Sequence, residues 1–317
     1  VFSCLIWFLV DKDKNISIYI YYALILCFSS LVIDGYFQFF TGKNLFGLKI
    51  FGTRVSSFFG NEHIMGSYLS RLFPLLFALF LVKKKTQYEI YFLGFLFVLI
   101  DILIFLSGER SAFFYLNLST LFIIILIKEY QRFRLMTFIV AIICIFFLST
   151  NSSKLSERMF LIPAANMGII ENTTNTKPSI FSPAHDSLIR TAFNMFKDKP
   201  ILGHGPKMFR QICKDVKYSV GISPCMTHPH NFYIQLLAET GIIGFLFFFS
   251  ILFYVFNVSI MQLKSIIFKK KRPLTDYQVC LLAAILITVW PFSPNGNFFN
   301  NWLMIVYCLP VGFYLQS

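Results

Sequence analysis

The chain has 317 residues, of which 56% are hydrophobic, 19% aromatic and 14% charged, and its formal net charge is +13 at pH 7. Soluble domains carry about 25% charged residues, and apolar runs near the roughly 20 residues that cross a bilayer recur along this sequence. The composition excludes a soluble globular protein. It predicts an all-α integral membrane protein, a multi-span helical bundle surrounded by membrane lipids, with no nucleic acid as a partner.

The beginning of the chain predicts a truncated N-terminus. Val1 takes the place of a methionine, and the first apolar stretch ends at Asp11, which makes it too short to cross a bilayer. We therefore expect further residues to precede this sequence. A cleaved signal peptide is the competing interpretation, but neither a basic segment nor a small-residue cleavage site is visible.

Apolar runs predict eight transmembrane spans and one partial span, and alternate connections between them carry thirteen basic residues. Because basic residues favour the cytoplasmic side, these connections are predicted to face the cytoplasm. The outer face then holds residues 34–65, the turn around Gly108 and residues 150–233. The predicted spans are residues 1–10 (partial), 16–33, 66–82, 88–106, 112–127, 135–149, 234–258, 276–291 and 299–316. The basic residues are Lys12, Lys14, Lys83, Lys84, Lys85, Lys128, Arg132, Arg134, Lys264, Lys269, Lys270, Lys271 and Arg272.

The long outer loop divides the chain into three parts: N-terminal transmembrane helices (1–149), a large loop (150–233) and C-terminal transmembrane helices (234–317). A connection of about eighty residues is far longer than usual and is typical of a functional segment. The loop contains four of the five histidines and ten Lys or Arg against five Asp or Glu. This balance indicates an anionic partner, although lysines that keep the loop soluble or contact lipid headgroups are the alternative.

Cys213 and Cys225 lie in this loop with no span between them. A disulfide would form in an oxidising outer compartment, and two free thiols are the other possibility. A zinc site that uses these cysteines with His228 and His230 is disfavoured, because the loop has no Cys-x-x-Cys or His-x-x-x-His spacing. No Asp-x-Asp pair occurs in an outer segment either, so we expect no metal.

Four segments carry a resemblance to a known family. The first runs from Thr227 to Gly244: His230-Asn231, nine residues, then Gly241-x-x-Gly244. This motif resembles that of the O-antigen ligase family at every position. Three further segments are similar to the same family: Arg190 to Gly205, with an apolar helix followed by Pro200 and a Gly-x-Gly turn, Ser107-Gly108-Glu109-Arg110-Ser111, and Arg54 to Glu62.

The resemblance implies a glycosyltransferase of lipopolysaccharide and polysaccharide biosynthesis. Such enzymes transfer a glycan from an undecaprenyl diphosphate carrier to an acceptor hydroxyl at the periplasmic face of the bacterial inner membrane, without metal or cofactor. The acceptor is lipid A core for a ligase, another lipid-linked glycan for a polymerase, and a protein for a protein O-oligosaccharyltransferase; the motif separates none of these. The resemblance also implies a GT-C-like fold with about a dozen spans.

The chemistry assigns roles to three residues. Arginine matches phosphate oxygens with a planar, permanently charged fork, so Arg110 and Arg190 are the candidates for binding the donor diphosphate. The alternatives are a salt bridge to Glu109 or contact with headgroups for Arg110, and a solvated helix face for Arg190. His230 is the candidate general base, because neutral imidazole accepts a proton near neutral pH, and nearby cations or a helix N-terminus would keep it neutral.

The remaining residues of the motif receive supporting roles. Asn231 is expected to cap the helix that follows, and His228 either contacts the acceptor or is an ordinary loop residue. Gly241 and Gly244 are expected to let a neighbouring span pack closely. Glu239, just inside the span, is assigned Arg110 or Arg71 as its partner.

A transporter is the alternative from another class, since transporters are also basic multi-span bundles with intramembrane arginines. The long outer loop and the lack of a detectable internal repeat disfavour it.

Overall fold

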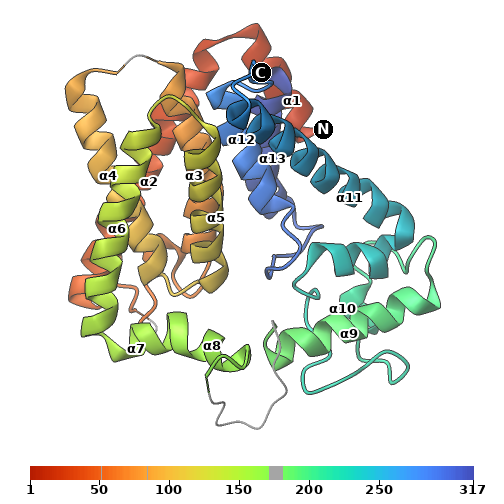
Figure 1. Ribbon diagram of the computed structural model, residues 1–317. Coiled ribbons are helices and arrows are strands. Elements are labelled where there is room, and N and C mark those ends of the chain that lie inside the picture. Colours follow the sequence, from red (N-terminus) through yellow and green to blue (C-terminus); the bar gives the residue numbers. More distant parts are fainter. Residues whose placement is uncertain (51, 84, 171–180) are drawn as a thin grey trace. The chain divides into compact units, whose positions relative to one another are not determined.

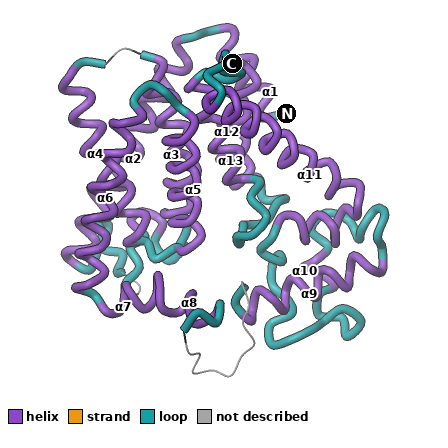
Figure 2. The backbone as a smooth tube through the Cα atoms, viewed as in Figure 1, coloured by secondary structure: helices purple, strands orange, loops and turns teal. Residues whose placement is uncertain are grey.

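The structure is a computed structural model that describes residues 1–50, 52–83, 85–170 and 181–317. Within these ranges the chain consists of helices joined by loops, as Figure 2 shows, and an isolated β-bridge pairs Lys43 with Lys49. Figure 1 labels the helices. They are α1 (Phe2–Lys12), α2 (Asn15–Thr41), η1 (Ser57–Phe59), α3 (Met65–Val82), α4 (Gln87–Leu106), α5 (Arg110–Leu126), α6 (Gln131–Asn151), α7 (Ser153–Ser156), η2 (Glu157–Leu161), α8 (Ile162–Asn166), α9 (Pro183–Asp198), α10 (Phe209–Ile212), α11 (Phe232–Ile267), α12 (Asp276–Thr288) and α13 (Asn301–Gln316).

Several of these helices have the dimensions of membrane spans. Within the described residues, five are long and apolar enough to cross a bilayer: α2, α3, α4, α6 and α11. α5 and α12 are shorter apolar helices. The protein is therefore an all-helical integral membrane protein, as its composition predicts. The number of eight spans and their orientation remain predictions.

The chain forms two compact units, which we describe separately. The bundle unit comprises residues 1–159, 258–288 and 306–317, and the loop unit comprises residues 160–257 and 289–305. The boundaries follow contacts within the protein, whereas the predicted division at residues 149 and 233 follows the expected membrane topology and remains a prediction.

α3 is the centre of the bundle unit. It packs against α2, α4, α5 and α12, and every residue from 69 to 80 is buried. The rings of Phe73, Phe77 and Phe80 surround that of Phe97 from α4, with centroids 5.2, 5.7 and 6.0 Å away. A helix that is enclosed by others buries its whole circumference, which explains why most of its residues are apolar, with Ser70 and Arg71 as buried exceptions.

A buried ion pair joins α4 to α6. Arg134 donates to both carboxylate oxygens of Asp101, at 2.8 and 3.1 Å, and to Thr120 Oγ1 of α5 at 2.6 Å. Both charged side chains are fully buried (0% and 1% exposed). The sequence analysis assigned Arg134 to a connection between spans, which is wrong, because Arg134 belongs to α6 and its side chain is buried in the bundle. Its partner Asp101 lies within an apolar run, so hydropathy alone does not reveal the pair.

Asp101→Asn is expected to lower the free energy of unfolding by about 3–5 kcal/mol, because the guanidinium of Arg134 would stay buried without its counter-ion. Thermal unfolding in detergent micelles measures this loss. The double variant Asp101→Leu with Arg134→Met is the control and should be more stable than the single variant. A single variant that unfolds at the wild-type temperature would contradict a role of the pair in stability.

The loop unit has a small core of its own. Residues from α9, α10, the segment that follows α10 and the start of α11 form it: Leu188, Ala192, Met195, Phe209, Cys213, Tyr218 and Ala238. Cys213 and Cys225 form a disulfide, with Cα atoms 5.1 Å apart. Because it joins the end of α10 to the segment that leads into α11, it limits the freedom of the residues just before His228.

α11 is broken at Gly241, whose φ of 66° and ψ of −164° are not helical. The segment after α9 pairs with the break: His204 N donates to Ala238 O (3.0 Å), Gly205 N to Glu239 O (2.8 Å) and Ile242 N to Pro200 O (2.8 Å). A Cβ on Gly241 would lie 2.2 Å from Ile201 O. The predicted close packing at Gly241 thus involves a loop backbone instead of a neighbouring span, and a Cβ on Gly244 would meet Thr240 of the same helix.

Candidate functional site

The turn between α4 and α5 holds Glu109 in a structural role. Its carboxylate accepts hydrogen bonds from Gly66 N (2.7 Å), Ser67 N (3.0 Å) and Ser67 Oγ (2.6 Å) at the start of α3. Burial raises the pKa of this carboxyl, and these hydrogen bonds oppose that shift. Because Glu109 caps α3, a salt bridge to Arg110 is not the arrangement that the structure shows.

Three arginines gather at the same turn; we call Arg54, Arg110 and Arg158 the arginine cluster. Arg54 Nε donates to Ser107 O at 3.2 Å, and Arg158 Nε donates to Gly108 O at 3.0 Å. Arg110 begins α5, and its charge interacts with those of the other two. Burial, followed by the charge of Arg158, lowers the pKa of Arg54.

The arginine cluster has the features of an anion site. Among the described residues, no ion pair joins its members to a carboxylate. The charge of Glu109 acts on Arg54 and partly offsets the repulsion there. Guanidinium groups that repel one another are further stabilised by a bound phosphate. The sequence singled out Arg110, and Arg54 only through a weak similarity. Arg158 was missed, because nothing in its spacing shows that it returns to a turn fifty residues earlier.

His230 lies at the entry to α11 in a fixed backbone conformation. Its φ of +56° is in the left-handed region, and its carbonyl accepts a hydrogen bond from Asn295 N at 2.8 Å. Asn231 caps the helix: Oδ1 accepts from Tyr233 N (3.0 Å) and Ile234 N (3.2 Å), and Nδ2 donates to Pro291 O (2.7 Å). These bonds fix the backbone at His230 and therefore the point from which its imidazole projects.

Three histidines of the loop unit cluster around this point. The ring of His230 lies 4.0 Å from that of His228 and 5.2 Å from that of His185, between centroids. His228 bonds Thr227 Oγ1 through Nδ1 (2.9 Å) and Asn295 O through Nε2 (3.3 Å). The sequence placed His185 in the loop without a role, and no spacing or motif could have joined it to His230.

Two of these histidines, His228 and His230, have pKa values below the ordinary value of histidine. Burial, followed by the charge of His185, lowers the pKa of His230 to about 4. Burial, followed by the charge of His230, lowers the pKa of His228 to about 4. Both imidazoles are therefore unprotonated near neutral pH, the form in which a histidine accepts a proton.

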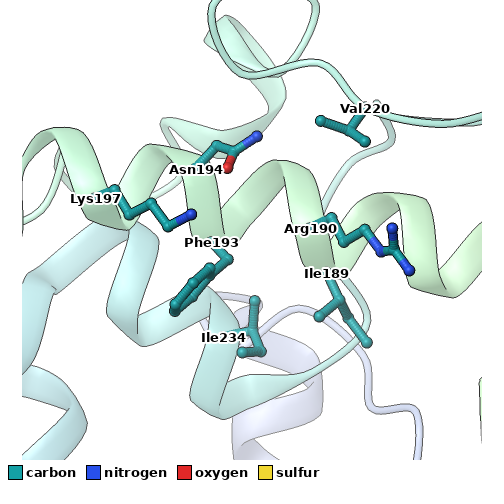
Figure 3. Close-up of a pocket in the computed structure, with 7 residues that line it drawn as sticks. All are labelled: Ile189, Arg190, Phe193, Asn194, Lys197, Val220 and Ile234. Carbon is teal, nitrogen blue, oxygen red and sulfur yellow. The ribbon is translucent and has the colours of Figure 1, made fainter.

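Arg190 lies on the exposed face of α9 and forms an ion pair with Asp186 at 2.8 Å. It lines a pocket of about 350 Å³ with Ile189, Phe193, Asn194, Lys197, Val220 and Ile234, shown in Figure 3. Arg190 and the histidines belong to the loop unit, whereas Arg110 belongs to the bundle unit. The two predicted diphosphate ligands thus differ. Arg190 forms an ion pair with a carboxylate, whereas no ion pair of Arg110 occurs among the described residues.

Glu239 is buried and has partners other than the predicted arginines. Its carboxylate accepts from Phe209 N (2.8 Å) and from Gln235 Nε2 (3.0 Å). Gln235 also donates to Asn297 Oδ1 at 2.9 Å, which ties the segment before α13 to α11. Arg71, in the bundle unit, lies between the rings of Tyr115 and Tyr307.

The zinc alternative lacks its ligands. Cys213 and Cys225 are bonded to each other and cannot act as thiolates. Within the part of the chain that the structure describes, no group of three or more His, Cys, Asp or Glu is arranged to hold a metal ion.

The apolar helices define a membrane protein, which carries an arginine cluster at one helix turn and two neutral histidines at a helix entry. Residues 93–249 match the family model described as O-antigen ligase. This match confirms the resemblance to the O-antigen ligase and polymerase family that was found in the sequence. No curated protein and no solved structure matches the chain.

The family match supports a general activity. It indicates a ligase or polymerase type of glycan transfer in polysaccharide biosynthesis, with a lipid-linked glycan and a glycan acceptor as partners. The matched range contains Arg110, Arg158, Arg190 and His230, and Arg54 precedes it.

Proposed function

We propose that the protein transfers a glycan from an undecaprenyl diphosphate carrier to an acceptor hydroxyl at the periplasmic face of the bacterial inner membrane, in the manner of an O-antigen ligase with lipid A core as acceptor. The observation that carries the proposal is His230: a neutral, partly buried imidazole that its backbone holds at the entry of α11, within the family motif.

The reaction needs a base and a cationic partner for the leaving group. As the acceptor oxygen bonds to the anomeric carbon, its proton passes to His230. The bond between that carbon and the diphosphate oxygen breaks, and the diphosphate leaves with the electron pair. Its added negative charge is balanced by arginine, which removes the need for a metal ion. We assign this role to Arg110, supported by Arg54 and Arg158, with Arg190 as a second ligand of the donor.

The supporting roles follow from the contacts. Asn231 holds the helix entry and so fixes where His230 lies. We assign acceptor binding to His228, and the contact of its ring with that of His230 supports this role.

The product of transfer tests the proposal. Membranes that contain the full-length protein are supplied with an undecaprenyl diphosphate-linked glycan and with lipid A core, a second lipid-linked glycan or an acceptor protein, in the presence of EDTA. A single glycan attached to lipid A core is the expected result. A ladder on the lipid carrier would identify a polymerase, and a glycoprotein would identify a protein O-oligosaccharyltransferase. Absence of transfer to all three acceptors, with the protein present at normal levels, would contradict the enzyme assignment.

A further inference from the structure

His185 approaches His230 from a separate helix. The two residues are 45 positions apart in the sequence, yet their ring centroids are 5.2 Å apart and the rings meet edge to face, with an interplanar angle of 76°. His228 contacts His230 at 4.0 Å. His230 is thus in contact with one imidazole from its own segment and one from α9.

His185 is itself held in place at the start of α9. Ser182 caps the helix, since its Oγ accepts a hydrogen bond from His185 N at 3.4 Å, and the same Oγ bonds His185 Nδ1 at 2.9 Å. One turn on, Leu188 and Ala192 are completely buried in the core of the loop unit. Ser187 Oγ accepts a hydrogen bond from Ile222 N at 3.2 Å, which joins α9 to the segment before Cys225. The ring of His185 is therefore carried by a packed helix.

We propose that His185 is a positioning residue for glycan transfer, which packs against the ring of His230 and keeps that ring in the orientation that receives the acceptor proton. This inference rests on the proposed role of His230 as the base. The edge-to-face contact restricts rotation of the His230 imidazole about its Cβ–Cγ bond, a freedom that the hydrogen bonds of its backbone do not remove. Small errors in the position of a base are costly, since a displacement of about 1 Å can lower a rate by ~100-fold.

The same contact also affects the proton affinity of His230. In the part of the chain that the structure describes, His230 is faced by His185 from α9 and by His228 from its own segment, while the 289–305 segment contributes the backbone of Asn295. Arg210 of α10 acts on His228. A charge on His185 disfavours a second charge on His230, so replacing His185 with an uncharged residue should raise the pKa of His230.

Two substitutions of His185 distinguish the effect of its ring contact from the effect of its charge. His185→Ala removes the contact, and we expect kcat to fall by about tenfold or more while KM for the lipid-linked donor stays within about twofold, because the base is misplaced and donor binding is unaffected. His185→Phe retains an aromatic ring, so it should recover most of the rate, with the acidic limb of the pH–rate profile moved to higher pH. Lys199→Gln, an exposed change at the other end of α9, is the control and should leave kcat and the profile as in the wild type.

A direct readout of the histidines keeps this test independent of activity. The chain has five histidines, so NMR of the full-length protein with labelled histidine follows each imidazole through a pH titration, with His230→Asn to assign the signal. His185→Phe should move the titration of His230 to higher pH. Wild-type kcat in His185→Ala, or an unchanged His230 titration in His185→Phe, would overturn the proposal. Inactivity of the wild type towards every acceptor would instead reject the proposed function, while the titration would still report the contact.

Discussion

His230→Asn is expected to lower the rate of glycan transfer by about 10²–10⁴-fold, the usual contribution of a general base. Asparagine suits this test because it tolerates the left-handed backbone that His230 adopts, whereas alanine would add strain. The change therefore removes the imidazole and leaves the entry to α11 in place. Initial rates with the lipid-linked donor, normalised to the amount of protein in the membrane, measure the effect.

His228→Asn is the matched control, since it removes an imidazole two residues away. We expect it to affect the KM for the acceptor more than kcat. Equal rates for His230→Asn and the wild type would remove His230 as the base, and equal losses in both variants would show that the pair acts as one structural unit.

The pH dependence of the wild type follows from the same residue. His230 accepts a proton only when it is neutral, and its pKa is lowered to about 4, so kcat/KM should stay level from pH 7 down to about pH 5 and fall as the pH drops through about 4. An ordinary histidine, with a pKa near 6.5, would lose activity about two pH units earlier. An acidic limb near pH 6.5 would show that the titrating group is exposed to water in the working enzyme.

Arg110→Gln is expected to reduce kcat/KM for the donor by roughly 10- to 150-fold, which corresponds to the ~1.5–3 kcal/mol of a hydrogen bond to a charged group. The reason is that the diphosphate would lose a guanidinium of the arginine cluster. Inorganic diphosphate, as a competitive inhibitor, measures the same site without the glycan, and its inhibition constant should rise in parallel.

The other arginines provide the comparison. Arg54→Gln and Arg158→Gln should weaken diphosphate inhibition in the same direction as Arg110→Gln. Arg190→Gln should have a smaller effect, because Arg190 already forms an ion pair with Asp186. Arg110→Lys should restore little, since an ammonium group cannot form the two parallel hydrogen bonds of guanidinium. Unchanged inhibition in Arg110→Gln would rule out the arginine cluster as the diphosphate site.

The sequence predicted the bounds of a helix well where the length and hydropathy that a bilayer requires determine those bounds. Predicted spans at 66–82 and 88–106 correspond to α3 (Met65–Val82) and α4 (Gln87–Leu106), because length and hydropathy are what a membrane selects. The span predicted at 234–258 was less accurate. α11 runs from Phe232 to Ile267 and breaks at Gly241, and the spacing of two glycines does not reveal which of them has a positive φ.

The candidate site was predictable only where a local motif carries it. His230 and Asn231 are adjacent in the sequence, and their capping role follows from chemistry at the start of a helix. His185 meets His230 within the loop unit, and Arg158 meets the turn between α4 and α5 within the bundle unit. Both contacts arise from tertiary packing, and a single sequence contains no signal for contacts of that kind. Glu109 shows the converse, since the neighbour of Arg110 in the sequence turned out to cap α3.

The Asp101–Arg134 pair constrains how the protein enters the membrane. On scales of insertion by the translocon, a charged residue at the centre of a helix opposes transfer to lipid by about 2.5–3.5 kcal/mol. Asp101 leaves the ribosome 33 residues before Arg134, so α4 emerges with an uncompensated carboxylate and gains its counter-ion only when α6 follows. α4, α5 and α6 should therefore be released into the bilayer together, as one insertion unit during biogenesis.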